Sequence, residues 1–134
     1  MQAIINIDVP DLDAAIEFYA RATGLSLVRR LFDDTVAELE GAGLRVMLLL
    51  KEPRTTPVPQ ATLERDYNRH WTPVHLDFVV ADVETATHQA MAAGATLDLP
   101  IEDFVWGRQA CLRDPFGHGF CFLQWLGRGY DEVA

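Results

Sequence analysis

The chain has 134 residues, of which 49% are hydrophobic and 23% are charged, the balance of an ordinary globular protein. A chain of this length can bury about two-thirds of the surface that its unfolded form exposes, so it needs neither a metal nor a disulfide to fold. Its 20 acidic and 11 basic residues give a net charge of -9, which disfavours binding to nucleic acids and to anionic membranes.

The chain starts with a strand-like run at residues 3–7, and no basic segment or long apolar stretch precedes it. We therefore expect no signal peptide. No apolar run reaches the ~20 residues that a membrane-spanning helix requires. Two cysteines do not make a disulfide framework. Together these features predict a cytoplasmic protein.

The first module, residues 1–52, is predicted to contain one strand, one helix and three further strands. A β-rich run ends at Pro10, and Asp11 is typical of a helix N-cap because its carboxylate accepts hydrogen bonds from the first turn. Gly24 stands where a left-handed glycine commonly ends a helix. The apolar face predicted for this helix comprises Leu12, Ala15, Ile16 and Tyr19. The three further strands are expected at residues 25–31, 35–40 and 44–50.

Residues 53–73 are predicted to be a linker because prolines interrupt the pattern there. These prolines are Pro53, Pro57, Pro59 and Pro73. Within the linker, residues 61–69 are expected to hold a short helix.

The second module, residues 74–126, repeats the pattern of the first. A shift of 71 residues places Asp11 on Asp82, the expected N-cap of the second helix, which Gly94 is expected to end. The apolar face of this helix is predicted to comprise Val83, Ala86, Ala90 and Met91. Strands are expected at residues 96–100, 108–113 and 120–125, with a turn at residues 114–117 and a polar tail at residues 127–134.

This order of elements predicts an α+β fold of two tandem βαβββ modules within a single domain, residues 1–134. Five short motifs, in this order and at this spacing, carry a resemblance to a known family: Val9-Pro10-Asp11-Leu12, Phe18-Tyr19, Gly24-Leu25, Trp106-Gly107-Arg108 and Asp114-Pro115-Phe116-Gly117. With them the chain resembles the vicinal oxygen chelate superfamily, which includes glyoxalase I, bleomycin- and fosfomycin-resistance proteins and extradiol dioxygenases. The resemblance implies that each module forms a curved mixed sheet and that paired modules form a cleft for a small molecule.

Catalytic members of this superfamily hold a divalent metal, whose ligands are often His and Glu from the first and last strands of each module. The resemblance assigns these four positions to Ile4, Leu48 or Leu49, His75 and Cys121. Because two of them are alkyl side chains, we predict no metal cofactor. If a divalent metal is bound, His75 and Cys121 are its expected ligands, and a set that adds Asp77 would suit a soft metal.

His75 and Asp77 are the candidate catalytic residues. His75 stands at a ligand position of the superfamily and can act as a general base, a hydrogen-bond partner or a ligand, while the alternative is a structural histidine in the core. Period-two alternation places Asp77 on the same strand face. A carboxylate there needs a partner, for which Arg108 or Arg45 is expected; otherwise it binds or deprotonates a ligand.

Two other histidines lie outside the predicted strands. His70 is expected either at the mouth of the cleft or simply exposed in the linker, and His118, in a tight turn, is expected to face solvent.

Cys111 and Cys121 are predicted to face each other if the hairpin closes over residues 114–118. Directly opposed strand residues lie about 4.5–5.5 Å apart at Cα, within the range of a disulfide. Two interpretations remain open: a redox or metal-binding pair in the cleft, or two small apolar side chains packed in a core.

Several side chains are candidates for the wall of the ligand cleft. The candidate ligand-binding residues are Trp71, Phe104, Trp106, Arg108 and Cys121. Phe120 and Phe122 add further aromatic surface, which suits planar or apolar ligands. The alternative is that some of these aromatic residues fill the core.

The sequence leaves open whether the protein is an enzyme. One hypothesis is a glyoxalase- or bleomycin-resistance-like protein that binds a small, partly aromatic or apolar molecule without the usual divalent metal. The other is a lyase, isomerase or dioxygenase that uses His75 with Asp77 or Cys121. Under both hypotheses the resemblance implies a homodimer, which would cover exposed sheet edges, with a small molecule as the other partner.

Overall fold

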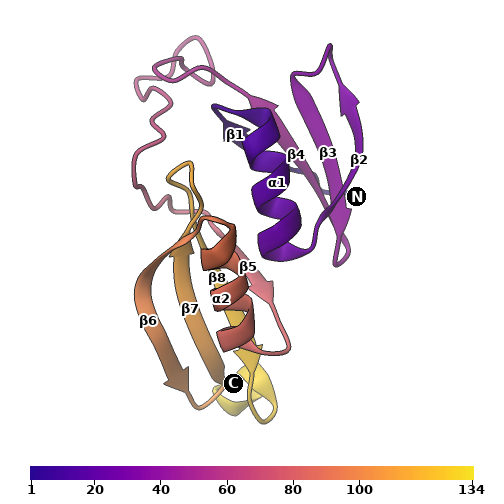
Figure 1. Cartoon of the computed structure of the whole chain (residues 1–134). Coiled ribbons are helices and arrows are strands. Elements are labelled where there is room, and N and C mark those ends of the chain that lie inside the picture. Colours follow the sequence, from indigo (N-terminus) through magenta and orange to yellow (C-terminus); the bar gives the residue numbers. More distant parts are fainter. The chain divides into compact units, whose positions relative to one another are not determined.

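A computed structural model describes residues 1–134 as two compact units, Met1–Asn68 and Arg69–Ala134. The boundary between the units falls inside the segment predicted to be a linker, residues 53–73. Each unit contains one helix and a four-stranded sheet (Figure 1).

The first unit has the predicted order of one strand, one helix and three strands. Its elements are β1 (Ile5–Val9), α1 (Leu12–Thr23), β2 (Ser26–Leu31), β3 (Val36–Gly41) and β4 (Leu44–Leu50). The strands lie in the order β1-β4-β3-β2, in which β1 and β4 are parallel and the other neighbours are antiparallel. The sheet therefore pairs the first strand of the unit with its last.

The second unit repeats this topology. Its elements are β5 (Leu76–Val79), α2 (Val83–Ala93), β6 (Thr96–Phe104), β7 (Gly107–Arg113) and β8 (Gly119–Trp125). The strands lie in the order β5-β8-β7-β6, again with a parallel pair of first and last strands. In the tail, Gly129–Glu132 form one 3-10 turn. The fold is thus the predicted tandem of βαβββ modules.

Strand β6 is longer than the sequence predicted, which was a strand that ends at Pro100. It continues to Phe104, and its register against β7 shifts on both sides of Leu99. An edge strand tolerates a proline, since the missing N–H can face solvent, and an irregular register absorbs the local misfit. A proline was therefore a poor signal for the end of this strand.

The helix ends agree with the caps expected from the sequence. The carboxylate of Asp11 accepts a hydrogen bond from the N–H of Ala14 at 3.0 Å, and Asp82 does the same for Thr85 at 3.0 Å. Gly24 and Gly94 follow the helices with φ angles of 74° and 119°, a left-handed region that disfavours other residues. Neither helix is long and apolar enough to cross a membrane.

The buried faces of the helices differ in part from the predicted ones. In α1, Ile16 is only half-buried, whereas Phe18 is 1% exposed. In α2, Met91 is 45% exposed and Thr87 is buried in its place. The core side of α2 follows Val83, Thr87 and Ala90, a spacing of four and then three residues, and Met91 lies to one side of this stripe. Hydrophobicity alone favoured Met91 as a core residue, but the rotation of the helix about its axis decides which side chains face the core.

The helix expected at residues 61–69 is absent. The backbone of this segment pairs with another part of the linker instead: the N–H of Arg65 donates to the carbonyl of Thr55 at 2.8 Å, and that of Arg54 donates to the carbonyl of Arg65 at 2.9 Å. The Arg65 side chain also forms an ion pair with Asp8 at 2.7 Å. These contacts hold the linker on β1, so its backbone groups need no helix to be satisfied.

Candidate functional site

The two faces of the second sheet carry different side chains. Phe120, Phe122 and Gln124 of β8 lie on the side of α2, since the Gln124 amide oxygen accepts a hydrogen bond from the N–H of Val83 at 2.9 Å. Residues between them point the other way. We call this other side, which carries Asp77, Val79, Leu99, Cys111 and Cys121, the distal face.

Four residues form a row across the distal face. The strand register places Asp77 of β5 beside Cys121 of β8, Cys121 beside Cys111 of β7, and Cys111 beside Leu99 of β6. Directly paired residues of neighbouring strands point to the same side of a sheet. One carboxylate, two thiols and one aliphatic side chain therefore lie next to one another.

His75 joins the carboxylate end of this row. Its Nε2 lies 3.2 Å from Oδ1 of Asp77, and the two side chains are 39% and 34% exposed. The donor atoms of His75, Asp77 and Cys121 all lie within 4.8 Å of one another. The structure thus brings together the two candidate catalytic residues and one candidate ligand-binding residue.

The two cysteines are directly opposed, so the predicted pairing is confirmed. Both are free thiols, with 3.5 Å between the two sulfur atoms. Burial, the hydrogen bond with Cys111 and the negative charge of Asp77 raise the pKa of the Cys121 thiol far above its usual value. Cys121 is therefore a neutral thiol at physiological pH, which makes it a poor nucleophile on its own.

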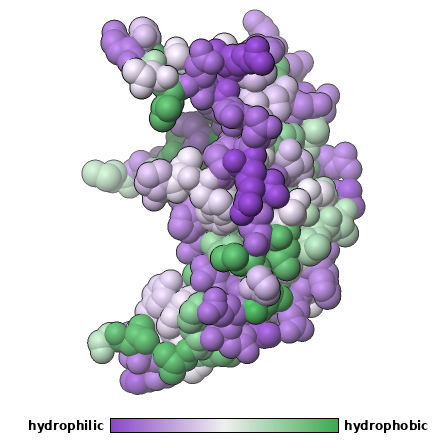
Figure 2. All heavy atoms as spheres, turned by 90° about the vertical axis from the view of Figure 1, so that its left-hand side faces the viewer, coloured by the Kyte–Doolittle hydropathy of each residue, from purple (hydrophilic) through white to green (hydrophobic).

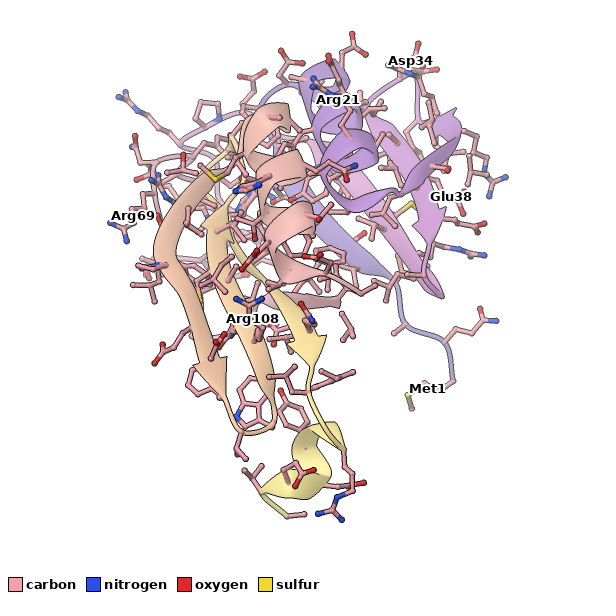
Figure 3. All side chains as sticks on the ribbon, turned by 60° about the horizontal axis from the view of Figure 1, so that its bottom comes forward. Met1, Arg21, Asp34, Glu38, Arg69 and Arg108 are labelled. Atoms are coloured by element: carbon pink, nitrogen blue, oxygen red, sulfur yellow. The ribbon has the colours of Figure 1, made fainter.

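The partner expected for Asp77 was wrong. Arg108 is on the α2 side of its sheet, where it forms ion pairs with Glu84 at 2.9 Å and Asp103 at 2.6 Å (Figure 3). Arg45 belongs to the first unit and forms ion pairs with acidic residues there. Strand alternation explains the Arg108 error: a residue paired with Gln124 cannot reach the distal face. The partner of Asp77 is His75.

The aromatic residues predicted to line one cleft are in three different places. Phe120 and Phe122 pack against Phe78 in the core of the second unit. Phe104 stacks on Trp106 with 5.0 Å between ring centroids, and Trp106 also packs against Trp125 and Tyr130. Trp71 lies at the other end of β8, beside Gly119. Trp71 packs against His75, a residue of the His75–Asp77–Cys121 group.

Trp71 is held beside His75 by a buried carboxylate that the sequence analysis did not single out. The ring centroids of Trp71 and His75 are 5.7 Å apart, and the indole N–H of Trp71 donates to Asp98 at 2.9 Å. Asp98 is 5% exposed and also forms ion pairs with Arg113 and Arg69. Burial opposes its ionisation, but the hydrogen bonds from Arg113 and Trp71 and the positive charges outweigh it and lower the pKa of Asp98.

Gly119 gives Trp71 the space that it occupies. A Cβ atom at residue 119 would lie 2.4 Å from the indole ring of Trp71. We expect Gly119→Ala to displace the indole and to lower the free energy of unfolding by about 1–2 kcal/mol. In a Trp71→Ala background, the same change should cost less than about 0.5 kcal/mol. Urea denaturation of the four proteins measures this cycle, and equal costs in both backgrounds would contradict the steric explanation.

His118 does not face solvent as expected. It is half-buried, and its Nδ1 lies 2.7 Å from Nε2 of His70 in the linker. The turn at residues 114–117, directly before His118, is stabilised as its sequence predicts. The carboxylate of Asp114 accepts hydrogen bonds from the N–H groups of Phe116 and His118 at 2.8 and 2.9 Å. The two histidines fasten the segment that carries Trp71 to this turn.

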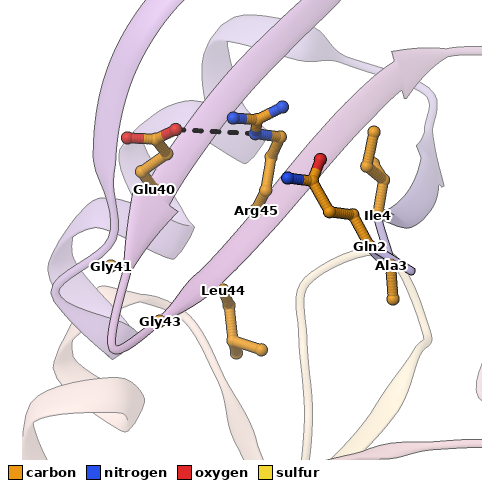
Figure 4. Close-up of a pocket in the computed structure, with 8 residues that line it drawn as sticks. All are labelled: Gln2, Ala3, Ile4, Glu40, Gly41, Gly43, Leu44 and Arg45. Atoms are coloured by element: carbon orange, nitrogen blue, oxygen red, sulfur yellow. Dashed lines mark ion pairs between the residues drawn. The ribbon is translucent and has the colours of Figure 1, made fainter.

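In the first unit, polar side chains gather on the side of the sheet opposite to α1. Glu38 is 2% exposed and lies between two arginines, with Arg29 at 2.5 Å and Arg45 at 3.2 Å. Beside it is a hollow of about 660 Å³ whose lining includes Ile4, Glu40 and Arg45 (Figure 4). Glu38 could not be recognised from the sequence, because an acidic residue inside a predicted strand gives no sign of its burial.

The residues present do not fit the divalent metal of the superfamily. Its four ligand positions fall on Ile4, Leu48 or Leu49, His75 and Cys121, and alkyl side chains offer no lone pair to a metal. Ile4 is 48% exposed at the rim of the hollow, and Leu48 is fully buried. Two donors are too few for a firm divalent site.

Comparisons with known proteins place the chain in a family. The sequence model described as "Glyoxalase-like domain" matches residues 4–123. Over 63 residues, 46% of this chain, it is 44% identical to uncharacterized proteins of Mycobacterium bovis and Mycobacterium tuberculosis. This segment spans 39% of the first protein and 35% of the second, so the match covers well under half of either relative.

Several solved structures have the same fold. The fosfomycin resistance protein FosX of Listeria monocytogenes superimposes with a TM-score of 0.70 and 18% identity, over 94% of this chain and 93% of that one. A glyoxalase/bleomycin resistance protein/dioxygenase family enzyme of Burkholderia phytofirmans gives a TM-score of 0.71 and 21% identity, over 92% and 97%. TioX of a Micromonospora species gives 0.65 and 24%, over 93% and 100%. The likenesses to these structures show the fold, and the match to the sequence model shows that the chain belongs to the glyoxalase-like domain family.

Proposed function

We propose that the protein binds a small, partly aromatic or apolar molecule on the distal face, without the four-ligand metal centre of its superfamily. The observation that carries this proposal is the pair His75–Asp77, in contact at 3.2 Å on a sheet face that also carries exposed aliphatic side chains. Val79 is 56% exposed and Leu99 is 57% exposed. A few polar groups set into an apolar wall are typical of a small-molecule site, because the wall supplies affinity and the polar groups fix orientation.

The alkyl side chains at two of the superfamily's metal-ligand positions support the binding of a small molecule rather than metal catalysis. A mutant of the fosfomycin resistance protein FosX has been crystallised with Mn(II) and a dihydroxypropylphosphonic acid. In this chain, two of the four positions that the superfamily uses for such an ion carry Ile4 and a leucine. A ligand must therefore be held by hydrogen bonds and apolar contacts of the chain itself.

The test is a pair of titrations of the isotope-labelled protein followed by amide NMR, in the presence of EDTA. The probes are metal-free bleomycin and anilinonaphthalene sulfonate, a partly aromatic anion. We expect saturable shifts at Val79, Leu99 and Cys121, and an affinity for bleomycin at least 10-fold lower in Asp77→Asn. His88→Ala, which changes an exposed histidine of α2, should bind like the wild type. Shifts confined to the aromatic cluster around Trp106, or no saturation with either probe, would contradict the proposal.

A second candidate function is proton transfer, favoured by the 3.2 Å contact between Nε2 of His75 and Asp77. A carboxylate that binds one ring nitrogen orients the imidazole and leaves the other nitrogen to act as a base. This predicts exchange of the α-protons of a small hydroxyketone, such as dihydroxyacetone, with D2O. His75→Ala should abolish the exchange, and an equal rate in both proteins would exclude this role.

We also propose that the chain forms a homodimer, because members of the superfamily pair their modules within or between chains. The edge strands of the two sheets are β1, β2, β5 and β6, and a symmetric contact would cover one of these edges. Analytical ultracentrifugation at micromolar concentration should give a mass near twice the 15.0 kDa of the chain. A monomer under these conditions would contradict the proposal.

A further inference from the structure

Cys111 and Cys121 have a chemistry that the binding of an organic molecule does not use. They are the two cysteines of the chain, both are free thiols, and their sulfur atoms lie 3.5 Å apart on the distal face. A disulfide bond is about 2.05 Å long, so the two sulfur atoms must approach by roughly 1.5 Å to form one. Small rotations of the two side chains cover this distance, provided that the two backbones are close enough.

The register of β7 and β8 brings the two backbones close enough. At the end of this hairpin, Asp114 and His118 form a hydrogen-bonded pair, since the N–H of Asp114 donates to the carbonyl of His118 at 2.9 Å. Hydrogen-bonded and non-hydrogen-bonded pairs alternate along an antiparallel ladder, so Cys111 and Cys121, three steps further, are a non-hydrogen-bonded pair. The Cα atoms of such a pair are about 4.5 Å apart, within the range of about 4.4–6.8 Å that disulfides span.

The two thiols differ in their access to solvent. Cys111 is half-buried, whereas Cys121 is 1% exposed. The S–H of Cys121 donates a hydrogen bond to the sulfur of Cys111, so Cys121 keeps its proton and Cys111 presents a lone pair. An oxidant from solvent therefore meets Cys111 first, and Cys121 is placed to react with the product. Hydrogen peroxide is small enough to reach a half-buried thiol, and it oxidises thiols by this route.

We propose that Cys111 and Cys121 are a modification site at which hydrogen peroxide converts the two thiols into a reversible disulfide. In the first step, the thiolate of Cys111 attacks one oxygen of the peroxide and the O–O bond breaks. This step leaves a sulfenic acid on Cys111, and the departing hydroxide takes up the proton that Cys111 released. In the second step, the sulfur of Cys121 attacks the sulfur of Cys111 and the S–O bond breaks. The hydroxide that leaves takes up the proton of Cys121, so two thiols lose two electrons and one peroxide becomes two water molecules.

The disulfide is reversible because its more accessible sulfur belongs to Cys111. A thiol from solvent attacks that sulfur, and Cys121 leaves into a site where it is readily protonated. The crosslink joins two strands that are already paired, so the fold of the second unit stays the same. The inference goes beyond the proposed function and does not depend on it, since neither step needs a bound organic molecule.

The experiment treats the reduced full chain with a small excess of hydrogen peroxide in the presence of EDTA. Remaining thiols are then blocked with N-ethylmaleimide in denaturant, and the intact mass is measured. We expect about 90% of the chains to lose two hydrogen atoms, to take up no maleimide and to remain single chains. Dithiothreitol should restore both reactive thiols. Two thiols that still react with maleimide, a gain of oxygen without a disulfide, or a disulfide between two chains would overturn the proposal.

Variants then test the order of the two steps. In Cys121→Ser the sulfenic acid of Cys111 has no thiol to react with, so dimedone, which traps sulfenic acids, should label it. In Cys111→Ser the buried Cys121 should be labelled about 10-fold less. Equal labelling of the two variants, each shown to be folded by amide NMR, would overturn the assigned order. His88→Ala is the matched control and should form the disulfide like the wild type.

The mass of the oxidised wild type decides the proposal even if a cysteine variant fails to fold. Since no organic probe is present, this result is also independent of the bleomycin titration. A disulfide in a chain that binds neither probe would support this inference and contradict the proposed function alone.

Discussion

Replacing Phe122 by alanine should lower the free energy of unfolding of the second unit by about 3–5 kcal/mol. Phe122 is 1% exposed on the α2 side of β8, and its ring packs against Phe78 at 6.2 Å and Phe120 at 5.4 Å. The substitution removes this apolar contact and leaves a cavity, which neighbours fixed in a sheet fill only partly. Urea denaturation, with hydrogen exchange of the β7 and β8 amides, measures the loss.

Leu99→Ala is the matched control for this prediction. Leu99 is also an apolar residue of the second sheet, but it lies on the distal face and is 57% exposed. Its truncation should change the free energy of unfolding by less than about 1 kcal/mol, since little buried surface is lost. Similar costs for the two variants would show that the core is not on the α2 side.

Removing the carboxylate of Asp98 should lower the free energy of unfolding by about 2–3 kcal/mol at neutral pH. Three groups lose their partner in Asp98→Ala: the guanidinium groups of Arg113 and Arg69 and the indole N–H of Trp71. Trp71 should then move away from His75, which changes tryptophan fluorescence. Asp103→Ala is the control in the same strand, because Asp103 is 69% exposed in its ion pair. It should cost less than about 1 kcal/mol.

The effect of Asp98 should depend on pH in a defined direction. Its pKa is lower in the folded chain than in the unfolded one, so its contribution is fully present above the ordinary aspartate pKa of about 3.9. The contribution is lost as the pH falls through the folded-state pKa. The gap in stability between the wild type and Asp98→Asn should therefore be constant near pH 7 and shrink below about pH 4. A gap that grows on acidification would contradict the assigned ion pairs.

The sequence predicted most of the fold because its local signals agree with one another. Asp11 and Asp82 cap the helices, Gly24 and Gly94 end them, and strand alternation sets the faces of the sheets. The opposition of Cys111 and Cys121 followed from a hairpin that closes over residues 114–118. Errors arose where long-range contacts decide, as in the linker at residues 61–69, whose backbone pairs with other linker residues.

In the candidate site, only the contacts within one strand or one hairpin could be predicted from the sequence. Alternation placed His75 beside Asp77, and the hairpin placed Cys111 beside Cys121. The partner of Asp77 was misassigned to arginines, because the sequence does not say that Arg108 faces α2.

Figure 2 shows hydrophobic side chains gathered in the lower part of the view. The exposed apolar residues of the second unit include Leu99, Val105, Trp125, Leu126, Tyr130 and Val133. Nothing in the alternating pattern separates such residues from those of a core.

The parallel pairing of the first and last strands of each unit has a consequence for the order in which the protein is made. Ile5 pairs with Val46, and Leu76 pairs with Phe120, so each sheet is closed by a strand synthesised last. As the chain leaves the ribosome, β5 has no hydrogen-bonding neighbour until β8 emerges, although β6 and β7 can already form a hairpin. A nascent chain stalled before Gly119 would therefore expose β5 and the apolar side of α2, the state in which chaperones would recognise it.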